Sequence, residues 1–381
     1  MTHHEALSPK GPTHGHPPVS RDNWRDQLAQ DRQGHRDSVL EHRRQFTRQD
    51  QAQVCSIGKV LTRLNSHHFQ NREDLIALKR TLSEGQDSPD EFFTDFGAVH
   101  SLVGVLNASN AGLEVLALHC IANLAPLSEK NGLTLARSAG PYLITLLASS
   151  SHQLQEGAGV ALGNLALSGP KVVKVLNNQE VIESLLPVLE SRLENVQGAG
   201  FYALYHVLHA GLIPSSSQHG RMIEACKRSM GLKAPVEVFW VLFVLSCDSN
   251  LHIELAHNTV ISRALDVCTY EIFQKSDSRP LVKIVTPIVR ILANLCAGPR
   301  SENACLAVLR HSDLPAILMA LLGTNFTHLC KETLWWFGNL VNSDSVEVQE
   351  ELIDLEIMDR MEYHTVQAIR RLDPFQTHVI A

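Results

Sequence analysis

Apolar residues recur with helical periodicity along most of the chain after Cys55. The apolar segments are about 10 to 15 residues long, and short clusters of Ser, Asn, Gly and Pro separate them. Leu, Ala and Val dominate a hydrophobic content of 44%, whereas aromatic residues make up only 6%. This composition suits helix-on-helix packing better than a sheet-rich sandwich. The pattern therefore predicts an all-α fold in which one helix follows another.

The first 53 residues have a different pattern. Residues 1–20 are rich in Pro, His, Ser and Gly and lack apolar periodicity, so we expect a disordered tail. Residues 21–53 place a few apolar side chains, such as Trp24 and Phe46, among seven arginines. Such a segment predicts a solvent-exposed helix, or one that folds on a partner. We expect residues 373–381 to form a second tail.

One short phrase recurs along the chain and predicts a structural repeat. Ala or Gly, then Asn, then Leu stand together at Asn123, Asn164, Asn294 and Asn339. From Asn164, which is 41 residues after Asn123, steps of 42 and 38 residues reach His206 and Val244 in similar apolar surroundings. Steps of 50 and 45 residues then reach Asn294 and Asn339. Helical repeats of this length indicate armadillo or HEAT units, each of which buries its apolar face against its neighbours.

A second phrase in the same phase favours armadillo repeats. It contains Gly97 in one unit, Gly140 in the next and Pro315 in a later one. A very short first helix needs a tight glycine turn before the second helix, as armadillo units have. We therefore expect a right-handed superhelical armadillo solenoid over residues 55–372, with about six full units between residues 89 and 343. Residues 75–82 predict the last helix of a partial first unit, and residues 346–364 begin another partial unit.

Charge is unevenly distributed along the chain, which has a net charge of −7. Through Asp74 there are 11 Lys and Arg against 9 Asp and Glu, so this part is +2. The remainder has 22 against 31, so it is −9. A nucleic-acid-binding body needs a clustered positive face. We therefore expect no nucleic-acid partner, and a basic peptide is the better candidate.

The eight cysteines include no Cys-x-x-Cys pair, and the first residues are polar. We expect reduced thiols, an intracellular protein and no secretory leader. The longest apolar run, residues 238–245, is far shorter than the roughly 20 residues that cross a bilayer. No membrane-spanning helix and no membrane partner are expected.

No residue pattern predicts catalysis or a bound cofactor. Gly157 and Gly159 resemble a dinucleotide fingerprint weakly, and Gly198 and Gly200 repeat the same spacing 41 residues later. Close packing of neighbouring helices explains both pairs better than phosphate binding. None of the 20 histidines pairs with Cys at metal-ligand spacing. No nucleophile elbow, Walker loop or kinase signature occurs, so we expect a non-enzymatic protein with no metal site and no cofactor.

The recurring Asn has two interpretations. Asn is a poor residue for a helix interior, so its return at one repeat position implies a role. Its side chain could hydrogen-bond a neighbouring backbone group and hold the repeats together. It could instead hold the backbone of an extended peptide on a concave face, and the sequence leaves both open.

These motifs resemble the importin-alpha family, whose armadillo adaptors hold basic cargo signals on ladders of Trp and Asn along their third helices. The resemblance covers most of the chain. Residues 286–294 are similar to that family's sixth repeat, in which Arg stands in the ladder position of Trp. Trp240 and Trp335 each stand four residues before a ladder position. The resemblance implies a peptide-binding face formed by Asn123, Asn164, Trp240, Arg290, Asn294, Trp335 and Asn339.

The ladder departs from the family's pattern in its first half. His119, Val160 and Tyr202 occupy Trp positions, and His206 replaces an Asn. We therefore expect weak binding of short basic or mixed peptides at the far end of the array, and little at Asn123 and Asn164.

At that far end Glu302, Glu332 and Asp344 are expected to supply negative charge. The Arg290 guanidinium would repel a basic peptide or pair with a carboxylate. Of the adjacent Trp335 and Trp336, one must face away from the other, so simple packing is the competing interpretation.

Residues 21–53 resemble the family's importin-beta-binding segment, although acidic residues such as Asp31 and Asp37 dilute the arginines. The residues that carry this resemblance are Trp24, Arg32, Arg36, Arg43 and Arg44. The resemblance implies importin-beta as a partner and an adaptor role in nuclear import, in cytoplasm and nucleus. The alternative is an armadillo scaffold that has lost import activity. With these departures from the Trp and Asn pattern, the sequence most resembles a branch of importin-alpha-like proteins that is named after transmembrane and coiled-coil segments.

Overall fold

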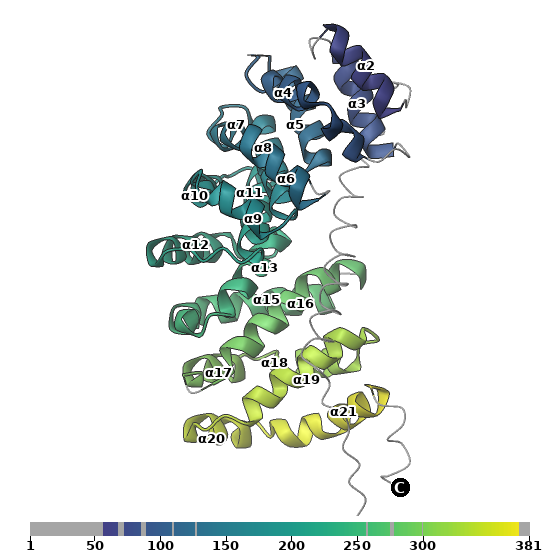
Figure 1. Ribbon diagram of the computed structural model, residues 1–381. Helices are drawn as coiled ribbons and strands as arrows, with labels where there is room; N and C mark the ends of the chain where they lie inside the picture. Colours follow the sequence, from purple (N-terminus) through teal and green to yellow (C-terminus); the bar gives the residue numbers. More distant parts are fainter. Residues whose placement is uncertain are drawn as a thin grey trace, which may run out of the picture. The chain divides into compact units, whose positions relative to one another are not determined.

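The structure is a computed structural model that describes residues 56–67, 72–84, 89–108, 110–125, 128–256, 258–274, 278–298 and 300–372. The chain divides into two compact units, Met1–Gln53 and Val54–Ala381. All described residues belong to the second unit, so the tails and the arm predicted at residues 1–53 and 373–381 lie outside them. Figure 1 shows the helices of the second unit following one another in chain order, from α2 and α3 to α20 and α21.

All regular structure within the described residues is helical, and five repeats there have a short first helix, a second helix and a longer third helix. The first three are η1 (Pro89–Thr94), α4 (Phe96–Val105) and α5 (Ala111–Leu124); α6 (Glu129–Ser138), α7 (Gly140–Leu146) and α8 (His152–Ala166); α9 (Pro170–Asn177), α10 (Val181–Leu189) and α11 (Glu194–His209). The other two are η2 (Ser249–Leu251) with α14 (His252–Leu255), α15 (Asn258–Phe273) and α16 (Ser278–Leu295); and α17 (Glu302–Leu309), α18 (Leu314–Gly323) and α19 (Thr327–Val341). This arrangement confirms the predicted all-α armadillo solenoid.

Three further helix pairs complete the array. Between α11 and η2, one repeat consists of a second helix, α12 (Ser216–Ser229), and a third helix, α13 (Val236–Ser246). The described residues begin with α2 (Ile57–His67) and α3 (Arg72–Glu84), which take the places of a second and a third helix. They end with α20 (Val346–Asp354) and α21 (Ile357–Leu372), a first and a second helix.

Side-chain caps fix where many of these helices begin. The Asp95 carboxylate accepts hydrogen bonds from the amides of Gly97 and Ala98 at the start of α4. Asn110 caps α5 in the same way, Ser128 caps α6 and Ser345 caps α20. These side chains satisfy amides that have no partner within the helix. The local sequence therefore determines where these helices begin.

The glycine before the second helix has a different physical basis from the predicted turn. A Cβ atom on Gly140 would collide with the side-chain oxygen of Gln179, whose Nε2 donates to the Ala136 carbonyl at 3.1 Å. Left-handed backbone falls instead on Glu180, with φ 63°, and on Glu356, with φ 49°. These residues immediately precede α10 and α21. Close approach of the Gln179 side chain from the neighbouring repeat, and not a left-handed turn, therefore favours glycine at position 140.

The third helices pack on one another along the array, and small residues allow their close approach. A Cβ atom on Gly163 of α8 would lie 2.5 Å from the Tyr202 ring of α11. On Gly159 it would lie 3.0 Å from the Ala199 carbonyl oxygen. On Gly157 it would lie 2.9 Å from Leu118 of α5. The packing role predicted for Gly157 and Gly159 is confirmed.

Exposed ion pairs connect the first and second helices of successive repeats. They join Lys171 to Glu129 at 2.9 Å, Arg221 to Glu183 at 2.7 Å and Arg228 to Glu190 at 2.6 Å. Surface pairs of this kind each contribute at most about 1 kcal/mol. They help to set the register of neighbouring repeats, but the apolar core supplies most of the stability.

Among the described residues, no single helix combines the length and apolar character of a membrane span. Two bent pairs meet that description only when each pair is taken together. They are Val236–Ser246 with Ser249–Leu255, bent by 106°, and Glu302–Leu309 with Leu314–Gly323, bent by 89°.

Candidate functional site

The four recurring Asn side chains each donate a hydrogen bond to the third helix of the preceding repeat. Asn164 Nδ2 donates to the Ala122 carbonyl at 2.8 Å, and Asn339 Nδ2 donates to the Ala293 carbonyl at 2.9 Å. Asn123 donates to Ser83 Oγ at 3.0 Å, and Asn294 donates to Ser246 Oγ at 2.9 Å. The predicted hydrogen bond to a neighbouring backbone group is therefore found at Asn164 and Asn339, whereas Asn123 and Asn294 donate to serine hydroxyls of the preceding repeat.

The side chain of Asn164 is buried between third helices and is not accessible to a peptide. Its side chain is 2% exposed, and its Oδ1 atom accepts a hydrogen bond from the Tyr202 hydroxyl at 2.6 Å. His206 is also buried, with its ring 4.5 Å from the ring centre of Tyr202. The peptide-binding role assigned to Asn164 from the resemblance is thus corrected, because burial removes the side chain from any ligand.

The remaining ladder Asn residues are half-buried. Asn123, Asn294 and Asn339 keep part of their surface exposed while they donate to the preceding repeat. An Asn side chain has two N–H donors and a carbonyl acceptor. At Asn123 and Asn339, one hydrogen bond to the preceding helix therefore leaves capacity for a second partner. Asn294 Nδ2 already donates to both Ser246 Oγ and Cys247 Sγ.

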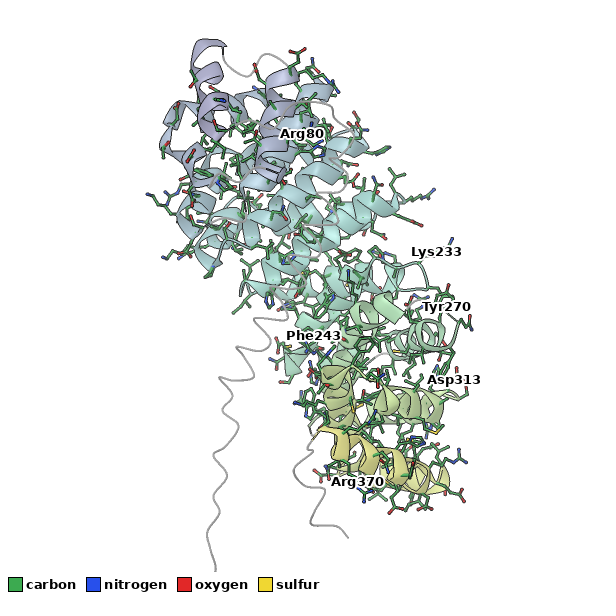
Figure 2. The ribbon with its side chains drawn as sticks, turned by 90° about the vertical axis from the view of Figure 1, so that its right-hand side faces the viewer. Arg80, Lys233, Phe243, Tyr270, Asp313 and Arg370 are labelled. Atoms are coloured by element: carbon green, nitrogen blue, oxygen red, sulfur yellow. The ribbon has the colours of Figure 1, made fainter. Side chains whose placement is uncertain are left out.

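Aromatic rings connect the middle third helices. The Tyr205 ring of α11 lies 5.7 Å from the Trp240 ring of α13, and Trp240 lies 5.9 Å from Phe243. The guanidinium of Arg290 in α16 lies over the Phe243 ring at 5.5 Å, in a cation–π arrangement. Figure 2 labels Phe243 on one side of the array and Tyr270 of α15 on the other. We call the side formed by the third helices the third-helix face.

Arg290 and Glu332 form a buried ion pair between α16 and α19. Arg290 Nε lies 2.9 Å from Glu332 Oε1, and a terminal guanidinium nitrogen lies 2.7 Å from the same oxygen. The two side chains are 9% and 7% exposed. Of the two outcomes predicted for Arg290, pairing with a carboxylate is the one found. The prediction that Glu332 attracts a basic peptide is wrong, because Arg290 already neutralises it.

Trp335 and Trp336 have opposite environments on α19. Trp336 is fully buried, whereas Trp335 is 47% exposed. Trp335 precedes Asn339 by one helical turn, and the exposed Lys331 precedes Trp335 by another turn. Glu302 and Asp344 are exposed at the start of α17 and just after α19. The ammonium group of Lys331, the indole of Trp335 and the amide of Asn339 therefore lie along one side of α19.

The five residues assigned to importin-beta binding lie outside the described part of the chain. These residues are Trp24, Arg32, Arg36, Arg43 and Arg44.

Buried thiols in the described residues have the character of core side chains. Burial raises the pKa of the Cys120 thiol to about 12 and raises the pKa of Cys226 and Cys268 further above the usual range. Thiols with such pKa values are poor nucleophiles at neutral pH. Cys247 is the exposed thiol at the end of α13. In the described part of the chain, no three His, Cys, Asp or Glu side chains converge to hold a metal ion.

A pocket of about 560 Å³ lies away from the third-helix face. Side chains of η1, α4 and α6 line it, together with the cap Ser128. Asn131 donates to Asp90 within its wall. Asp90 and Asn131 are thus paired with each other, and His100 and Lys130 also line the pocket.

Sequence reasoning did not identify Phe243 as part of the third-helix face, nor the bonding partners of Glu332 and Tyr202. Phe243 is one helical turn after Trp240, a spacing that could have identified it as part of the same stripe. Glu332 stands 42 residues after Arg290, which is one repeat length and the available signal of their pairing. The bond between Tyr202 and Asn164 spans 38 residues and follows from the same repeat phase.

Comparisons with known proteins agree with this architecture. The chain is 23% identical over 265 residues to importin subunit alpha-1b of Oryza sativa subsp. japonica, covering 68% of this chain and 47% of that protein. The chain thus spans about half the length of the curated relative it matches. No family model matches the sequence. None of these comparisons supports the more specific likeness to the transmembrane and coiled-coil branch.

One solved structure shows the same fold. A crystal structure of an engineered protein superposes with a TM-score of 0.64 at 16% identity, covering 82% of this chain and 76% of that chain. A designed armadillo repeat protein in complex with the peptide (KR)4 has a TM-score of 0.43 at 16% identity, covering 75% of this chain and 99% of that chain. The second unit is an all-α armadillo solenoid, and the chain has weak sequence similarity to importin-alpha.

Proposed function

We propose that the chain is a non-catalytic adaptor that holds a short extended peptide on the third-helix face, at Trp335 and Asn339. The observation that carries this proposal is the 47% exposure of Trp335 one turn before the half-buried Asn339. An exposed indole can stack on a long side chain of a peptide. The free capacity of the Asn amide can bond to the peptide backbone.

The charge of this region favours peptides of mixed sign. Lys331 is exposed on the same stripe as Trp335, while Asp344 is exposed just after α19 and Glu302 at the start of α17. The carboxylate of Glu332 is paired with Arg290 and is therefore not available to a peptide. A peptide that carries both an acidic and a basic side chain therefore meets opposite charges here, and a purely basic one gains less. Exposed pairs contribute little each, so binding is weak and salt-sensitive.

Weak similarity to importin-alpha supports a more specific form of this proposal. In that form residues 21–53 bind importin-beta, the chain carries cargo into the nucleus, and it occurs in cytoplasm and nucleus. The second candidate is a scaffold without import activity. The burial of Asn164 beneath Tyr202 favours the scaffold, because a peptide cannot reach the Asn side chain of that repeat.

Fluorescence anisotropy with labelled mixed-charge and (KR)4 peptides tests peptide binding. Trp335→Ala and Asn339→Ala should each weaken binding at least fivefold without loss of folding. Tyr142→Ala is the matched control, because Tyr142 is an exposed aromatic residue of the second helix α7. Unchanged affinity in both variants, or loss of folding in place of affinity, contradicts the proposed site.

Pull-down of importin-beta by the full chain separates the two candidates. The import adaptor should retain importin-beta at low salt and lose it when Arg32, Arg36, Arg43 and Arg44 are replaced by Ala. The scaffold should bind peptides and retain no importin-beta at any salt concentration.

A further inference from the structure

Two buried cysteines face each other where α16 ends and α17 begins. Cys296 follows the last residue of α16, and Cys305 lies within α17, nine positions further along the chain. Cys305 Sγ lies 3.8 Å from the Cys296 carbonyl oxygen, and the two thiol groups share a hydrogen bond. The two residues are 2% and 0% exposed. The two sulfur atoms are therefore in contact across a short connection, as a disulfide requires.

Hydrogen-bond donors around Cys305 favour its ionised form. The hydrogen bond from the Cys296 thiol holds the pKa of Cys305 below its ordinary value, although burial acts in the opposite direction. The hydroxyl groups of Ser301 and Ser343 also lower this pKa. At Cys226, by contrast, burial dominates and raises the pKa. Because the thiolate is the reactive form of cysteine, Cys305 is the nucleophile of the pair.

Cys296 has the opposite character. Its hydrogen bond to Cys305, together with burial, raises its pKa well above the ordinary value, so Cys296 keeps its proton. The indole N–H of Trp336 is buried, bonds to no nitrogen or oxygen atom among the described residues, and faces the Cys296 sulfur. A donor at this place stabilises negative charge on that sulfur once its proton leaves. The pair thus combines a thiolate with a protonated thiol that can react second.

We propose that Cys296 and Cys305 form a peroxide-sensitive dithiol that closes into a disulfide between the end of α16 and α17. The Cys305 thiolate attacks one oxygen of hydrogen peroxide and the O–O bond breaks. The departing hydroxide takes up the proton that the Cys305 thiol released and becomes water. The Cys296 sulfur then attacks the sulfenic acid on Cys305, and the sulfenic hydroxyl leaves with the Cys296 proton as a second water. Both sulfurs are oxidised, and peroxide accepts their electrons.

Burial selects the oxidant. Gly298 and Arg300, which lie between the two cysteines in the chain, are exposed, so the connection from α16 to α17 reaches the surface. The two cysteines themselves belong to the core. Hydrogen peroxide is small enough to reach them through a local opening of this connection, whereas glutathione disulfide is too bulky. We therefore expect peroxide to form the disulfide and glutathione disulfide to leave the pair reduced.

Peptide mapping of the peroxide-treated full chain tests the disulfide. Trypsin places Cys296 and Cys305 in separate peptides, residues 291–300 and 301–310, because an arginine ends each peptide and each holds a single cysteine. The reduced chain is treated with hydrogen peroxide at neutral pH, and the remaining thiols are then alkylated. Mass spectrometry of the unreduced digest should show the two peptides joined, with one hydrogen atom lost from each thiol. Dithiothreitol should separate them.

Variants test the roles of the two sulfurs. Cys296→Ser should accumulate a sulfenic acid on Cys305 that dimedone labels, because the second thiol is missing. Ser343→Ala should slow the joining of the peptides about threefold or more, because Cys305 loses a hydroxyl that favours its thiolate. Ser229→Ala is the matched control, since Ser229 is also half-buried and lies on α12 in an earlier repeat. Circular dichroism checks that each variant is folded.

Several results would overturn the proposal. One is the absence of joined peptides from the peroxide-treated folded chain, or their formation only after unfolding in urea. Another is dimedone labelling of Cys296 in Cys305→Ser at the rate found for Cys305 in Cys296→Ser, since Cys305 would then not be the nucleophile. A mixed disulfide of either cysteine with glutathione in the folded chain would contradict the selection by size. Loss of peptide binding at Trp335 would leave this inference unaffected, because neither cysteine belongs to that site.

Discussion

Arg290 of α16 and Glu332 of α19 form an ion pair at 2.7 Å in which both side chains are buried. The guanidinium also covers Phe243 of α13, so three successive third helices meet at one arginine. Two charges removed from water in this way depend on each other, because neither has bulk solvent to replace its partner.

Removing one member of this pair should destabilise the fold strongly. Glu332→Ala leaves the Arg290 guanidinium buried without its carboxylate, which should cost about 3 to 5 kcal/mol in the free energy of unfolding. The double variant Arg290→Met with Glu332→Leu should recover most of that loss, since apolar residues of similar size often replace a buried pair without penalty. Urea unfolding followed by circular dichroism measures both. Equal destabilisation of the single and double variants would contradict this account.

Tyr202 and Asn164 should show energetic coupling. Tyr202→Phe removes the hydroxyl that donates to Asn164 and should cost about 0.5 to 1.5 kcal/mol. Asn164→Ala should cost about 1 to 3 kcal/mol, because it removes both the acceptor of the Tyr202 hydroxyl and the donor to the buried Ala122 carbonyl. The double variant should lose less than the sum, as measured by a double-mutant cycle in urea. Strictly additive losses would show that the two groups do not interact.

Gly163 and Gly338 should respond in opposite directions to the same substitution. Gly163→Ala places a methyl group 2.5 Å from the buried Tyr202 ring and should destabilise the chain by about 1 to 3 kcal/mol. Gly338→Ala meets open space within a helix and should stabilise it by about 0.5 to 1 kcal/mol. Thermal unfolding of the two variants measures the difference. A loss of stability in Gly338→Ala would contradict the open space beside Gly338.

Stability should fall at alkaline pH because of the buried thiols. In the unfolded chain Cys120 ionises near its ordinary pKa of 9.0, whereas burial raises its pKa in the folded chain to about 12. Between these values the folded state retains a proton that the unfolded state has lost. The contribution is complete below pH 9 and declines as pH rises toward 12. Cys120→Ala should reduce this slope.

The repeat architecture could be predicted because its signal is periodic. The phrase around Asn123, Asn164, Asn294 and Asn339 falls near the end of third helices, and each copy reinforces the others. The left-handed turns at Glu180 and Glu356 could not be predicted, because Glu carries no preference for that backbone conformation. The repeat before η2 keeps the phase at Val244 but lacks the Asn, so spacing alone indicated its third helix.

The chemistry of the candidate site was harder to predict than the fold. The sequence places Trp335 and Trp336 side by side and cannot tell which one faces solvent, since a rotation of α19 by one residue position, about 100°, exchanges them. Packing against the preceding repeats decides it and buries Trp336. Likewise, a Glu at position 332 looks available to a ligand until its neighbour Arg290 is placed in space.

The Asn hydrogen bonds give the array a direction. Each of the four Asn side chains donates toward the amino-terminal neighbour of its own repeat. Deleting α5 would strand the amide of Asn164 in a buried position, where an unpaired donor is costly. Deleting α19 removes the donor Asn339 together with its bond and leaves only a carbonyl that water can reach. Repeats can therefore be trimmed from the carboxyl-terminal side with less loss of stability than from the amino-terminal side.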